Sequence, residues 1–307
     1  MKDVSIVSPA RNEEQNIKEF TEKTITALKK LKVDYEVIIV NDASTDSTGL
    51  ILTQLKSSYK NLKVICNRKR KGLTGSINIG FENAKNPIII FLPSDLESNP
   101  IEDIPKLLKT FEEGYDVVVG WRYNKKDNLV KRMLTFMFNS LISFLFKTKV
   151  HDVGWVKCFK KEILDNIEPL RSDWHRFFVM LASSEGYKIK EVKTKYYPRN
   201  KGTSKFGKFG FSRVPGAFFD LIVVKFFSVF SKRPMQIFGF MGLLSILFGL
   251  IIGIYLLYLH FILKFIINMM PFIVLILLFI ITGVILFGIG ILAEYLVSLR
   301  EQIRKLK

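Results

Sequence analysis

Two long segments without a charged residue constrain this chain more than any other feature. They are Gln236–Leu259 and Phe265–Ala293. A helix needs about 20 apolar residues to cross the hydrocarbon core of a bilayer, and both segments exceed that length. A soluble protein of 307 residues would have to bury two helices that are apolar on every side. We therefore predict a hairpin of two transmembrane helices, over residues 234–260 and 265–293.

Basic residues flank this predicted hairpin on one side. Lys232 and Arg233 precede the first span, and the tail at residues 294–307 adds four basic residues after the second. The connection between the spans contains a single lysine, Lys264. Because positively charged flanks stay in the cytoplasm, we predict an integral membrane protein with both termini and residues 1–235 on the cytoplasmic side.

The segment before the first span has a pattern of its own. In residues 213–233, polar side chains such as Arg213 and Asp220 gather near one helical face, which is typical of a helix in the membrane interface. The stretch from Arg199 to Arg233 has eight basic residues and one acidic residue. Such a stretch either binds anionic headgroups or a lipid phosphate, or serves as a solvated anchor, and the pattern leaves both open.

The remaining residues, 1–212, alternate between short apolar runs and helical patterns. Ile17, Phe20, Thr24, Leu28 and Leu31 recur at helical spacing. Alternation of strands and helices predicts an α/β domain with a mostly parallel, Rossmann-like sheet and helices on both faces. The predicted strands are Val4–Val7, Tyr35–Val40, Leu62–Ile65, Ile88–Leu92 and Asp116–Gly120, and further helices are predicted at Ser47–Tyr59 and Thr74–Ala84.

Ligands of such folds bind beyond the carboxyl ends of the strands, so the loops after the strands are the candidate site. Asp42 directly follows the second predicted strand, and we expect it to contact a ligand. Asp46 stands just before a predicted helix, where aspartate is a common N-terminal cap, so we favour the capping role there.

Composition excludes several classes of protein. The chain has 46 Lys and Arg against 28 Asp and Glu, but it is also 49% hydrophobic, unlike disordered basic tails. Cys66 and Cys158 are far apart, and no histidine pair has metal-site spacing, which argues against a disulfide scaffold and a zinc site. Neither GxGxxG nor a Walker motif is present. No recognised nucleic-acid module appears, so we expect no nucleic-acid partner.

The loop sequences resemble a known family. Residues 8–14 (SPARNEE) and 41–46 (NDASTD) are similar to the paired opening motifs of family 2 glycosyltransferases with the GT-A fold. Further stretches resemble the polyprenyl-phosphate branch of that family, which includes dolichol-phosphate mannose synthase and bacterial polyprenyl-phosphate glycosyltransferases. The resemblance covers roughly residues 3–210. The stretches behind the narrower match are Gly120–Arg122, Lys131–Asn139, His151–Trp155, Asp173–Phe177 and Arg199–Phe206.

The resemblance implies a nucleotide-diphospho-sugar donor, linked to UDP or GDP. By the match, Glu13 and Asp42 would contact its ribose and base. Pro9 and Ala10 would shape the floor of the pocket, and Lys71 would lie beside it.

The resemblance also implies a divalent metal. Asp95 aligns with the metal-binding Asp of the family's DxD-like motif, and Glu97 stands where mannose synthases have a Gln that shares the metal. Mg²⁺ or Mn²⁺ suits these oxygen ligands and would neutralise the departing diphosphate. Pro93 stands where the family commonly has a first Asp, so one donor contact is lost or supplied elsewhere. Because Glu97 restores a negative charge, we favour an active enzyme over a degenerate scaffold.

On the acceptor side, Arg122 and Arg132 match arginines that hold a phosphate. Arg199, Ser204 and Lys205 match the loop that closes over donor and acceptor. The expected catalytic residues are thus Asp95, Arg122 and Arg132. Arginine suits this task because its planar fork fits phosphate oxygens.

Chemistry supports a phosphate acceptor independently. A phosphate monoester has a second pKa near 6, so it is ionised at pH 7 and needs no general base. Direct attack by it on the anomeric carbon would invert the configuration of the sugar. A hydroxyl acceptor, as in glycolipid synthesis, would need a base, and Asp173 is then the candidate.

Glycines recur along the first predicted span, at Gly239, Gly242, Gly249 and Gly253. Small residues let helices approach closely in a membrane, so we expect close helix contacts there and a possible homo-oligomer.

Overall fold

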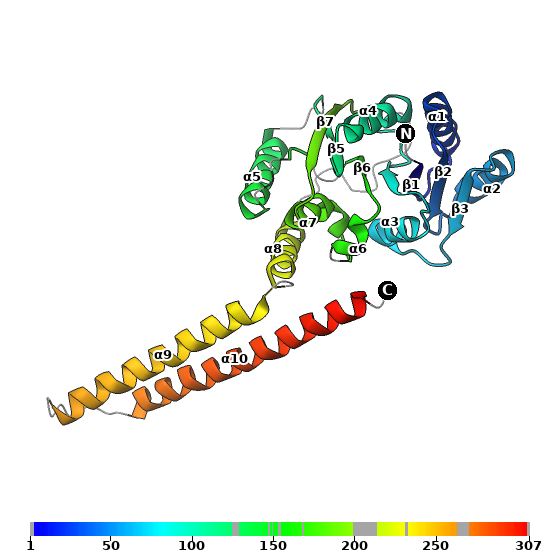
Figure 1. Ribbon diagram of the computed structural model, residues 1–307. Helices are drawn as coiled ribbons and strands as arrows, with labels where there is room; N and C mark the ends of the chain where they lie inside the picture. Colours follow the sequence, from blue (N-terminus) through cyan, green and yellow to red (C-terminus); the bar gives the residue numbers. More distant parts are fainter. Residues whose placement is uncertain are drawn as a thin grey trace. The chain divides into compact units, whose positions relative to one another are not determined.

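The computed structural model describes residues 3–124, 129–146, 148, 150–152, 155–167, 169–198, 214–230, 233–262 and 270–305 (Figure 1). The chain divides into two compact units, Met1–Lys225 and Phe226–Lys307.

The first unit is built on a seven-stranded sheet in the order β3-β2-β1-β4-β6-β5-β7. The five strands that the apolar runs predicted are confirmed, with ends shifted by one to three residues. Two further strands, β6 and β7, were not predicted because β6 has only four residues and β7 is largely polar. The bounds are β1 Val4–Ala10, β2 Tyr35–Asn41, β3 Leu62–Cys66, β4 Ile88–Phe91, β5 Val117–Arg122, β6 Lys157–Lys160 and β7 Ile189–Thr194.

Strand direction decides which loops meet. β1 pairs in parallel with β2 and β4, β2 with β3, and β5 with β7. β6 is antiparallel to both of its neighbours, β4 and β5. The sheet is therefore mostly parallel, as predicted. The carboxyl ends of β1, β2, β4 and β5 share one edge, which we call the carboxyl edge, and β6 begins at it.

Helices cover both faces of the sheet (Figure 1). The predicted apolar stripe of α1 is confirmed, since Ile17, Phe20, Thr24 and Leu28 are all buried. Together with α4, this helix covers one face, where Cys158 of β6 joins the core. The opposite face packs against α3 and α7 through the rings of Phe81, Phe159 and Phe178. The bounds are α1 Ile17–Leu31, α2 Thr48–Ser58, α3 Gly72–Glu82, α4 Pro100–Glu112, α5 Leu129–Phe146, α6 Ile163–Asn166, the 3₁₀ helix η1 Trp174–Phe177, α7 Phe178–Ser184 and α8 Val214–Phe230.

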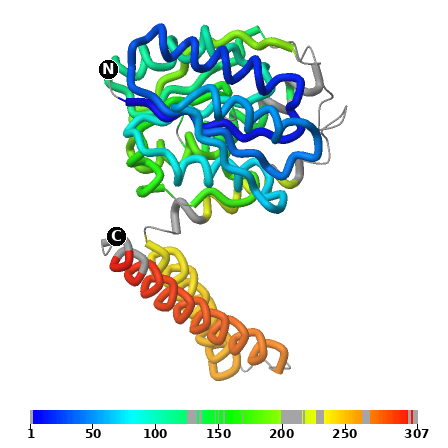
Figure 2. The backbone as a smooth tube through the Cα atoms, turned by 90° about the vertical axis from the view of Figure 1, so that its right-hand side faces the viewer, coloured from blue at the N-terminus to red at the C-terminus, as the bar shows by residue number. Residues whose placement is uncertain are grey.

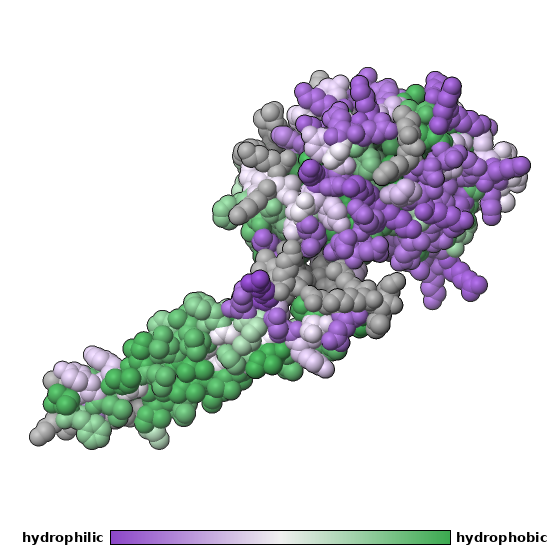
Figure 3. All heavy atoms as spheres, viewed as in Figure 1, coloured by the Kyte–Doolittle hydropathy of each residue, from purple (hydrophilic) through white to green (hydrophobic). Residues whose placement is uncertain are grey.

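The second unit is a helical hairpin. α9 (Pro234–Phe261) and α10 (Met270–Lys305) lie side by side (Figure 2). Both are long and apolar enough to cross a membrane. Apolar side chains dominate the visible surface of this hairpin, whereas the visible surface of the first unit is mainly hydrophilic (Figure 3).

Glycines make the hairpin tight. A Cβ added at Gly242 would lie 2.6 Å from the carbonyl oxygen of Gly283, and one at Gly249 would lie 3.2 Å from the Ile280 side chain. The expected close contacts of the first span are therefore present within this chain, between α9 and α10. Whether further copies associate stays a prediction.

Candidate active site

The loops after β1 and β2 are hydrogen-bonded to each other at the carboxyl edge. The backbone N–H of Asn12 donates to Ser44 Oγ at 3.0 Å, and the Asn12 amide oxygen accepts from the N–H of Thr45 at 2.9 Å. The N–H of Glu13 donates to Thr48 Oγ1 at 2.8 Å. The two motifs that resemble the opening motifs of the family thus form one connected rim, although 33 residues separate Asn12 from Thr45.

Asp46 belongs to the framework of this rim. Its carboxylate accepts from the N–H of Thr48 at 3.0 Å and from the N–H of Glu14 at 3.2 Å. Although burial acts to raise the pKa of Asp46, hydrogen bonds from Thr48 and Glu14 hold it below the ordinary value. Asp46 thus accepts from the first N–H of α2, as the capping role that we favoured requires, although the N-cap position itself is Ser47.

Asp42 is a heavily hydrogen-bonded acid of the edge. It is only 4% exposed. One carboxylate oxygen accepts from the N–H of Lys71 at 2.7 Å and from the Asn67 amide at 3.0 Å, and the other accepts from the N–H of Gly72 at 3.0 Å. Burial acts to raise the pKa of Asp42, but these hydrogen bonds outweigh it and lower the pKa. The carboxylate therefore fixes the start of α3, a role that the sequence analysis missed, and its contact with a ligand stays a prediction.

Positive φ angles concentrate at this edge. Among the residues that the structure describes, three of the five such non-glycine residues lie in its loops: Asn12 at 49°, Ala43 at 51° and Leu96 at 57°. A bulky residue such as Leu96 adopts this conformation at a cost, and such strain tends to cluster at functional sites. The strained turn sets Asp95 and Glu97 on either side of Leu96.

The loop after β4 carries the two acids expected to bind metal. Ser94 Oγ donates to the carbonyl of Pro9 at 2.9 Å, which joins this loop to β1. The N–H of Glu97 donates to Asp95 Oδ1 at 3.2 Å. The carbonyl of Glu97 accepts from the N–H of Tyr197 at 2.9 Å, so the segment after β7 lies against the same loop.

The donor set of this loop fits a hard divalent cation only in part. Asp95 and Glu97 offer carboxylate oxygens, which such ions prefer. Among the residues that the structure describes, no three acidic, histidine or cysteine side chains gather in a way that would hold a metal alone. Pro93 adds no side-chain ligand. A cation here would need oxygens from a bound diphosphate, so metal and donor would bind together.

Arg122 lies at the end of β5 with its guanidinium engaged. Its Nε donates to one carboxylate oxygen of Asp152, and a terminal nitrogen donates to the other at 2.9 Å. The guanidinium also lies 4.4 Å from the ring centroid of Trp155. Burial acts to lower the pKa of Arg122, but the charges of Asp152 and Glu97 raise it above the ordinary value. The arginine therefore stays charged and oriented, in the electrostatic field of the Asp95–Glu97 loop.

The sequence analysis missed the partners of Arg122. Asp152 lies in a quoted motif without an assigned role, and Glu191 of β7 carried no local signal. Glu191 accepts from the N–H groups of His151 and Asp152 at 2.6 and 3.1 Å, and from His151 Nδ1 at 2.7 Å. The His151 ring stacks on Trp121 with a centroid distance of 4.5 Å. Through Glu191, β7 thereby orients Asp152, and Asp152 in turn orients Arg122.

The structure places the remaining expected residues unevenly. Pro9 and Ala10 end β1, as a pocket floor would require, and Glu13 is buried, with its carboxylate accepting from the Asn16 amide at 2.9 Å. Lys71 precedes α3. Arg132 lies in α5, but its side chain is outside the described residues. The closing-loop residues Arg199, Ser204 and Lys205 also lie outside them.

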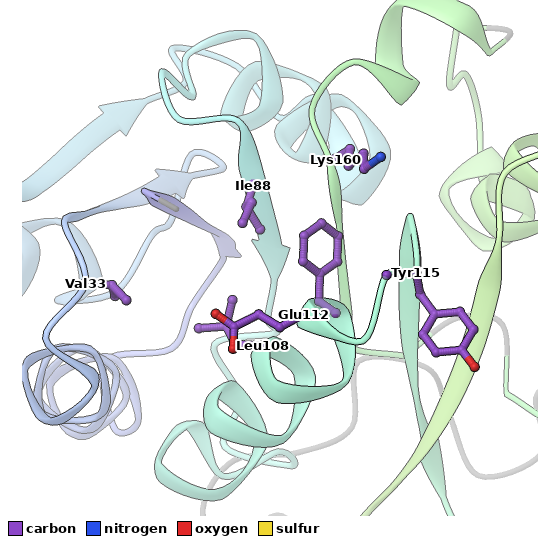
Figure 4. A pocket seen from close by; sticks show the side chains of 8 residues that line it. Val33, Ile88, Leu108, Glu112, Tyr115 and Lys160 are labelled. Atoms are coloured by element: carbon purple, nitrogen blue, oxygen red, sulfur yellow. The ribbon is translucent and has the colours of Figure 1, made fainter. Parts of the chain in front are cut away.

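Cavity size does not locate this site. A cavity of about 420 Å³ lies at the opposite edge of the sheet, lined by apolar side chains together with Glu112 and Lys160 (Figure 4). A smaller cavity of about 150 Å³ includes Asp95, Ser98 and Tyr197. The larger one contains none of the residues that the motifs single out.

Comparison with known proteins identifies the family. The sequence model of glycosyl transferase family 2 matches residues 5–168, so the chain belongs to this family. It is 33% identical over 253 residues to the undecaprenyl-phosphate 4-deoxy-4-formamido-L-arabinose transferase of Pseudomonas savastanoi pv. phaseolicola, covering 81% of this chain and 73% of the relative. It is 29% identical to the dodecaprenyl-phosphate galacturonate synthase of Rhizobium johnstonii, covering 95% and 87%.

Solved structures agree on the fold. Glucosyl-3-phosphoglycerate synthase from Mycobacterium tuberculosis, solved with Mn²⁺ and UDP, superposes with a TM-score of 0.53 at 16% identity, covering 73% of this chain and 80% of that one. The mannosyltransferase PcManGT from Pyrobaculum calidifontis, solved with GDP-Man and Mn²⁺, also gives 0.53 at 16% identity, covering 73% and 62%. The expected GT-A fold is confirmed.

Proposed function

We propose that this glycosyltransferase moves a single sugar from a nucleotide-diphospho-sugar to a polyprenyl phosphate with inversion at the anomeric carbon. The observation that carries the proposal is the extent of the similarity. The alignment with dodecaprenyl-phosphate galacturonate synthase covers 95% of this chain, so it extends beyond the sheet into the apolar helices. A lipid acceptor explains why a nucleotide-sugar enzyme has such helices.

The donor would bind over the carboxyl ends of β1, β2 and β4. Glu13 and Asp42 would receive its ribose and base, above Pro9 and Ala10, with Lys71 near the phosphates. Asp95 and Glu97 would hold Mg²⁺ or Mn²⁺ together with the diphosphate, and the ion would neutralise the charge of the departing group. Support for the metal comes from the oxygen donors of this loop and from the Mn²⁺ bound in both related structures.

The acceptor phosphate would bind to Arg122 and Arg132, under a loop with Arg199, Ser204 and Lys205. One phosphate oxygen forms the new bond to the anomeric carbon as the bond to the diphosphate oxygen breaks. Asp152 keeps the Arg122 fork in one orientation, which lowers the entropy lost when the phosphate binds. No proton has to be removed, because the phosphate is already ionised.

The alternative acceptor, a lipid hydroxyl, would need Asp173 as a base. The Asp173 carboxylate accepts from Arg176 at 2.7 Å, so it is engaged in an ion pair with a neighbouring residue. Among the described residues, no contact of Asp173 favours the hydroxyl acceptor over the phosphate. A degenerate scaffold would rest on Pro93 alone.

The membrane arrangement follows from charge and from α8. We propose that α9 and α10 span the bilayer, with both termini and the sheet domain in the cytoplasm. α8 exposes Phe219 and Ile222, as expected of an interfacial helix. Lys225 of α8 donates to the carbonyl of Leu145 in α5 at 2.6 Å, so α5 would lie at the same interface.

Single-molecule counting in bilayers would test the predicted homo-oligomer; monomers alone would refute it.

The deciding experiment uses the full-length protein in detergent. UDP- and GDP-sugars are supplied with Mg²⁺ or Mn²⁺, and release of the nucleoside diphosphate is measured with and without a short polyprenyl phosphate. Release that needs both lipid and metal would support the proposal and identify the donor. Release that needs a lipid alcohol instead would favour the hydroxyl acceptor. Intact nucleotide binding without release from any donor would favour the scaffold.

A further inference from the structure

Lys157 is a buried cation at the carboxyl edge. It is the first residue of β6, and because β6 runs antiparallel to its neighbours, its first residue lies where β4 and β5 end. Lys157 is only 3% exposed. Side chains alternate along a strand, so Lys157 shares the face of Phe159, where α3 and α7 pack.

The ammonium group has one hydrogen bond and two aromatic neighbours. Its Nζ donates to the carbonyl oxygen of His175 at 3.2 Å. The ring centroids of Phe91 and Phe178 lie 5.4 and 5.5 Å from it. No ion pair joins Lys157 to a carboxylate among the described parts of the chain. A buried charge without such a partner is costly, and a cost of this kind points to function rather than to stability.

These contacts connect three parts of the site. Phe91 ends β4, four positions before Asp95. His175 lies in η1, and its Nδ1 is 2.8 Å from Thr74 Oγ1, in the first turn of the helix whose start is held by Asp42. The charge of Asp152, the partner of Arg122, also acts on Lys157. Lys157 is thus linked to the elements that carry the proposed donor-binding residues and, through the charge of Asp152, to the proposed acceptor residue Arg122.

We propose that Lys157 is a positioning residue of the transfer reaction, whose buried positive charge fixes η1 against the end of β4 and holds Asp152, and through it Arg122, in place. The inference rests on the proposed function. A charge in a water-excluded site acts more strongly than one in water, so its loss would disturb the placement of both anionic substrates.

Titration of Lys157 offers a direct test. Burial lowers its pKa to about 8, against the opposing effect of the Asp152 carboxylate. Asp152 acts on it through its charge, without a hydrogen bond or ion pair among the described residues. η1 faces it directly: His175 presents its carbonyl, while its ring bonds to Thr74. Among the residues that the structure describes, β4 and α7 present the rings of Phe91 and Phe178 to it. Above about pH 8 the amine still donates to His175, but the charge is lost.

The first measurement is the pH profile of kcat for the full-length wild-type protein, with saturating donor and lipid. The rate is expected to fall about tenfold from about pH 7 to about pH 9, with a midpoint near 8, because the phosphates of both substrates keep their charge and the base of the donor stays mostly protonated over this range. A flat profile would overturn the inference while leaving the proposed function intact. Absence of any lipid-dependent release would overturn both.

Variants then assign the ionisation. Lys157→Met removes the charge at similar length and should lower kcat at least about tenfold with little change in KM for the donor. Lys157→Arg keeps its charge, so its relative rate should stay flat to about pH 9 whatever its absolute value. Lys160→Met is the matched control and should behave as wild type. Lys160 lies three residues further along the same strand and forms an ion pair with Asp116. A Lys157→Met rate within twofold of wild type, or an unchanged alkaline limb in Lys157→Arg, would refute the assignment.

Discussion

Asp152 occupies the fork of Arg122 with both carboxylate oxygens, across 30 residues of sequence. Arg122 ends β5, and its guanidinium lies over the ring of Trp155. Two parallel hydrogen bonds between charged groups fix the plane of the guanidinium as well as its position. The proposed acceptor arginine is therefore oriented before any phosphate arrives.

This pairing predicts the effect of two substitutions. Arg122→Ala should chiefly weaken use of the lipid acceptor, raising its apparent KM or lowering kcat/KM at least about 30-fold, because a buried charge-assisted contact is worth about 2–5 kcal/mol. Asp152→Asn should lower kcat/KM for the lipid less, by about 10-fold, since one hydrogen bond and the orientation are weakened. Initial rates against lipid concentration measure both. Nucleoside diphosphate binding serves as the control, and a change there of equal size would contradict the assignment.

Asp95→Ala should abolish metal-dependent turnover. The loop offers only Asp95 and Glu97 as carboxylate ligands, so removal of one leaves the ion with too few protein oxygens. We expect a loss of at least about 100-fold in kcat, and an equal loss when a chelator is added to the wild-type protein. Rates across a series of Mn²⁺ concentrations check this. Near-normal turnover in both Asp95→Ala and Arg122→Ala would mean that the site has been misplaced.

Asp42→Asn should loosen the start of α3. The substitution replaces one acceptor oxygen by an N–H donor that faces the N–H group of either Lys71 or Gly72, since each of them bonds to a different oxygen. Unsatisfied buried donors cost about 1–3 kcal/mol, so the melting temperature should fall and donor binding should weaken. Thermal melts with and without nucleoside diphosphate measure both effects. Asp46→Asn, at a neighbouring cap, should reduce stability with less effect on donor binding.

Asp103 predicts an unusual pH dependence of stability. It is 1% exposed, one of its oxygens has no hydrogen-bond partner, and burial raises its pKa to about 7. The folded protein therefore keeps a proton that the unfolded chain releases above about pH 4. The contribution of Asp103 to stability is present at low pH and is lost as the pH rises through about 7.

Asp103→Asn should accordingly raise the melting temperature at about pH 8 and change it little at about pH 4, with a difference of up to about 4 kcal/mol between the two. Parallel melts of variant and wild type at both pH values test this. An equal shift at both would show that packing, and not ionisation, dominates at Asp103.

Gly242→Leu should force the hairpin apart, because a side chain there would meet the backbone of Gly283. We expect a lower melting temperature in detergent, with a loss of about 1–3 kcal/mol from overpacking. Gly288→Leu is the matched control, since a Cβ at that position meets no atom within 4 Å. Equal destabilisation by both substitutions would contradict the glycine contact.

Local patterns predicted much of the first unit and both apolar helices. The apolar runs indicated β1 to β5 because a buried parallel strand needs apolar side chains on both faces. The spacing of Ile17, Phe20 and Leu28 indicated α1, because the buried face of a helix carries apolar side chains at helical spacing. β6 and β7 were not predicted, because a short or polar strand has too few apolar side chains to form a recognisable hydrophobic pattern.

The sequence by itself thus determined the alternation of strands and helices, the uncharged spans and the family motifs, since each is a property of neighbouring residues. Only the tertiary structure decided the partners at the site: Asp152 on Arg122, Glu191 beneath His151 40 residues away, and Lys157 behind both substrate sides. These pairings depend on which strands lie next to each other. The antiparallel entry of β6 and the edge position of β7 result from the packing of the whole sheet, which no local window of sequence records.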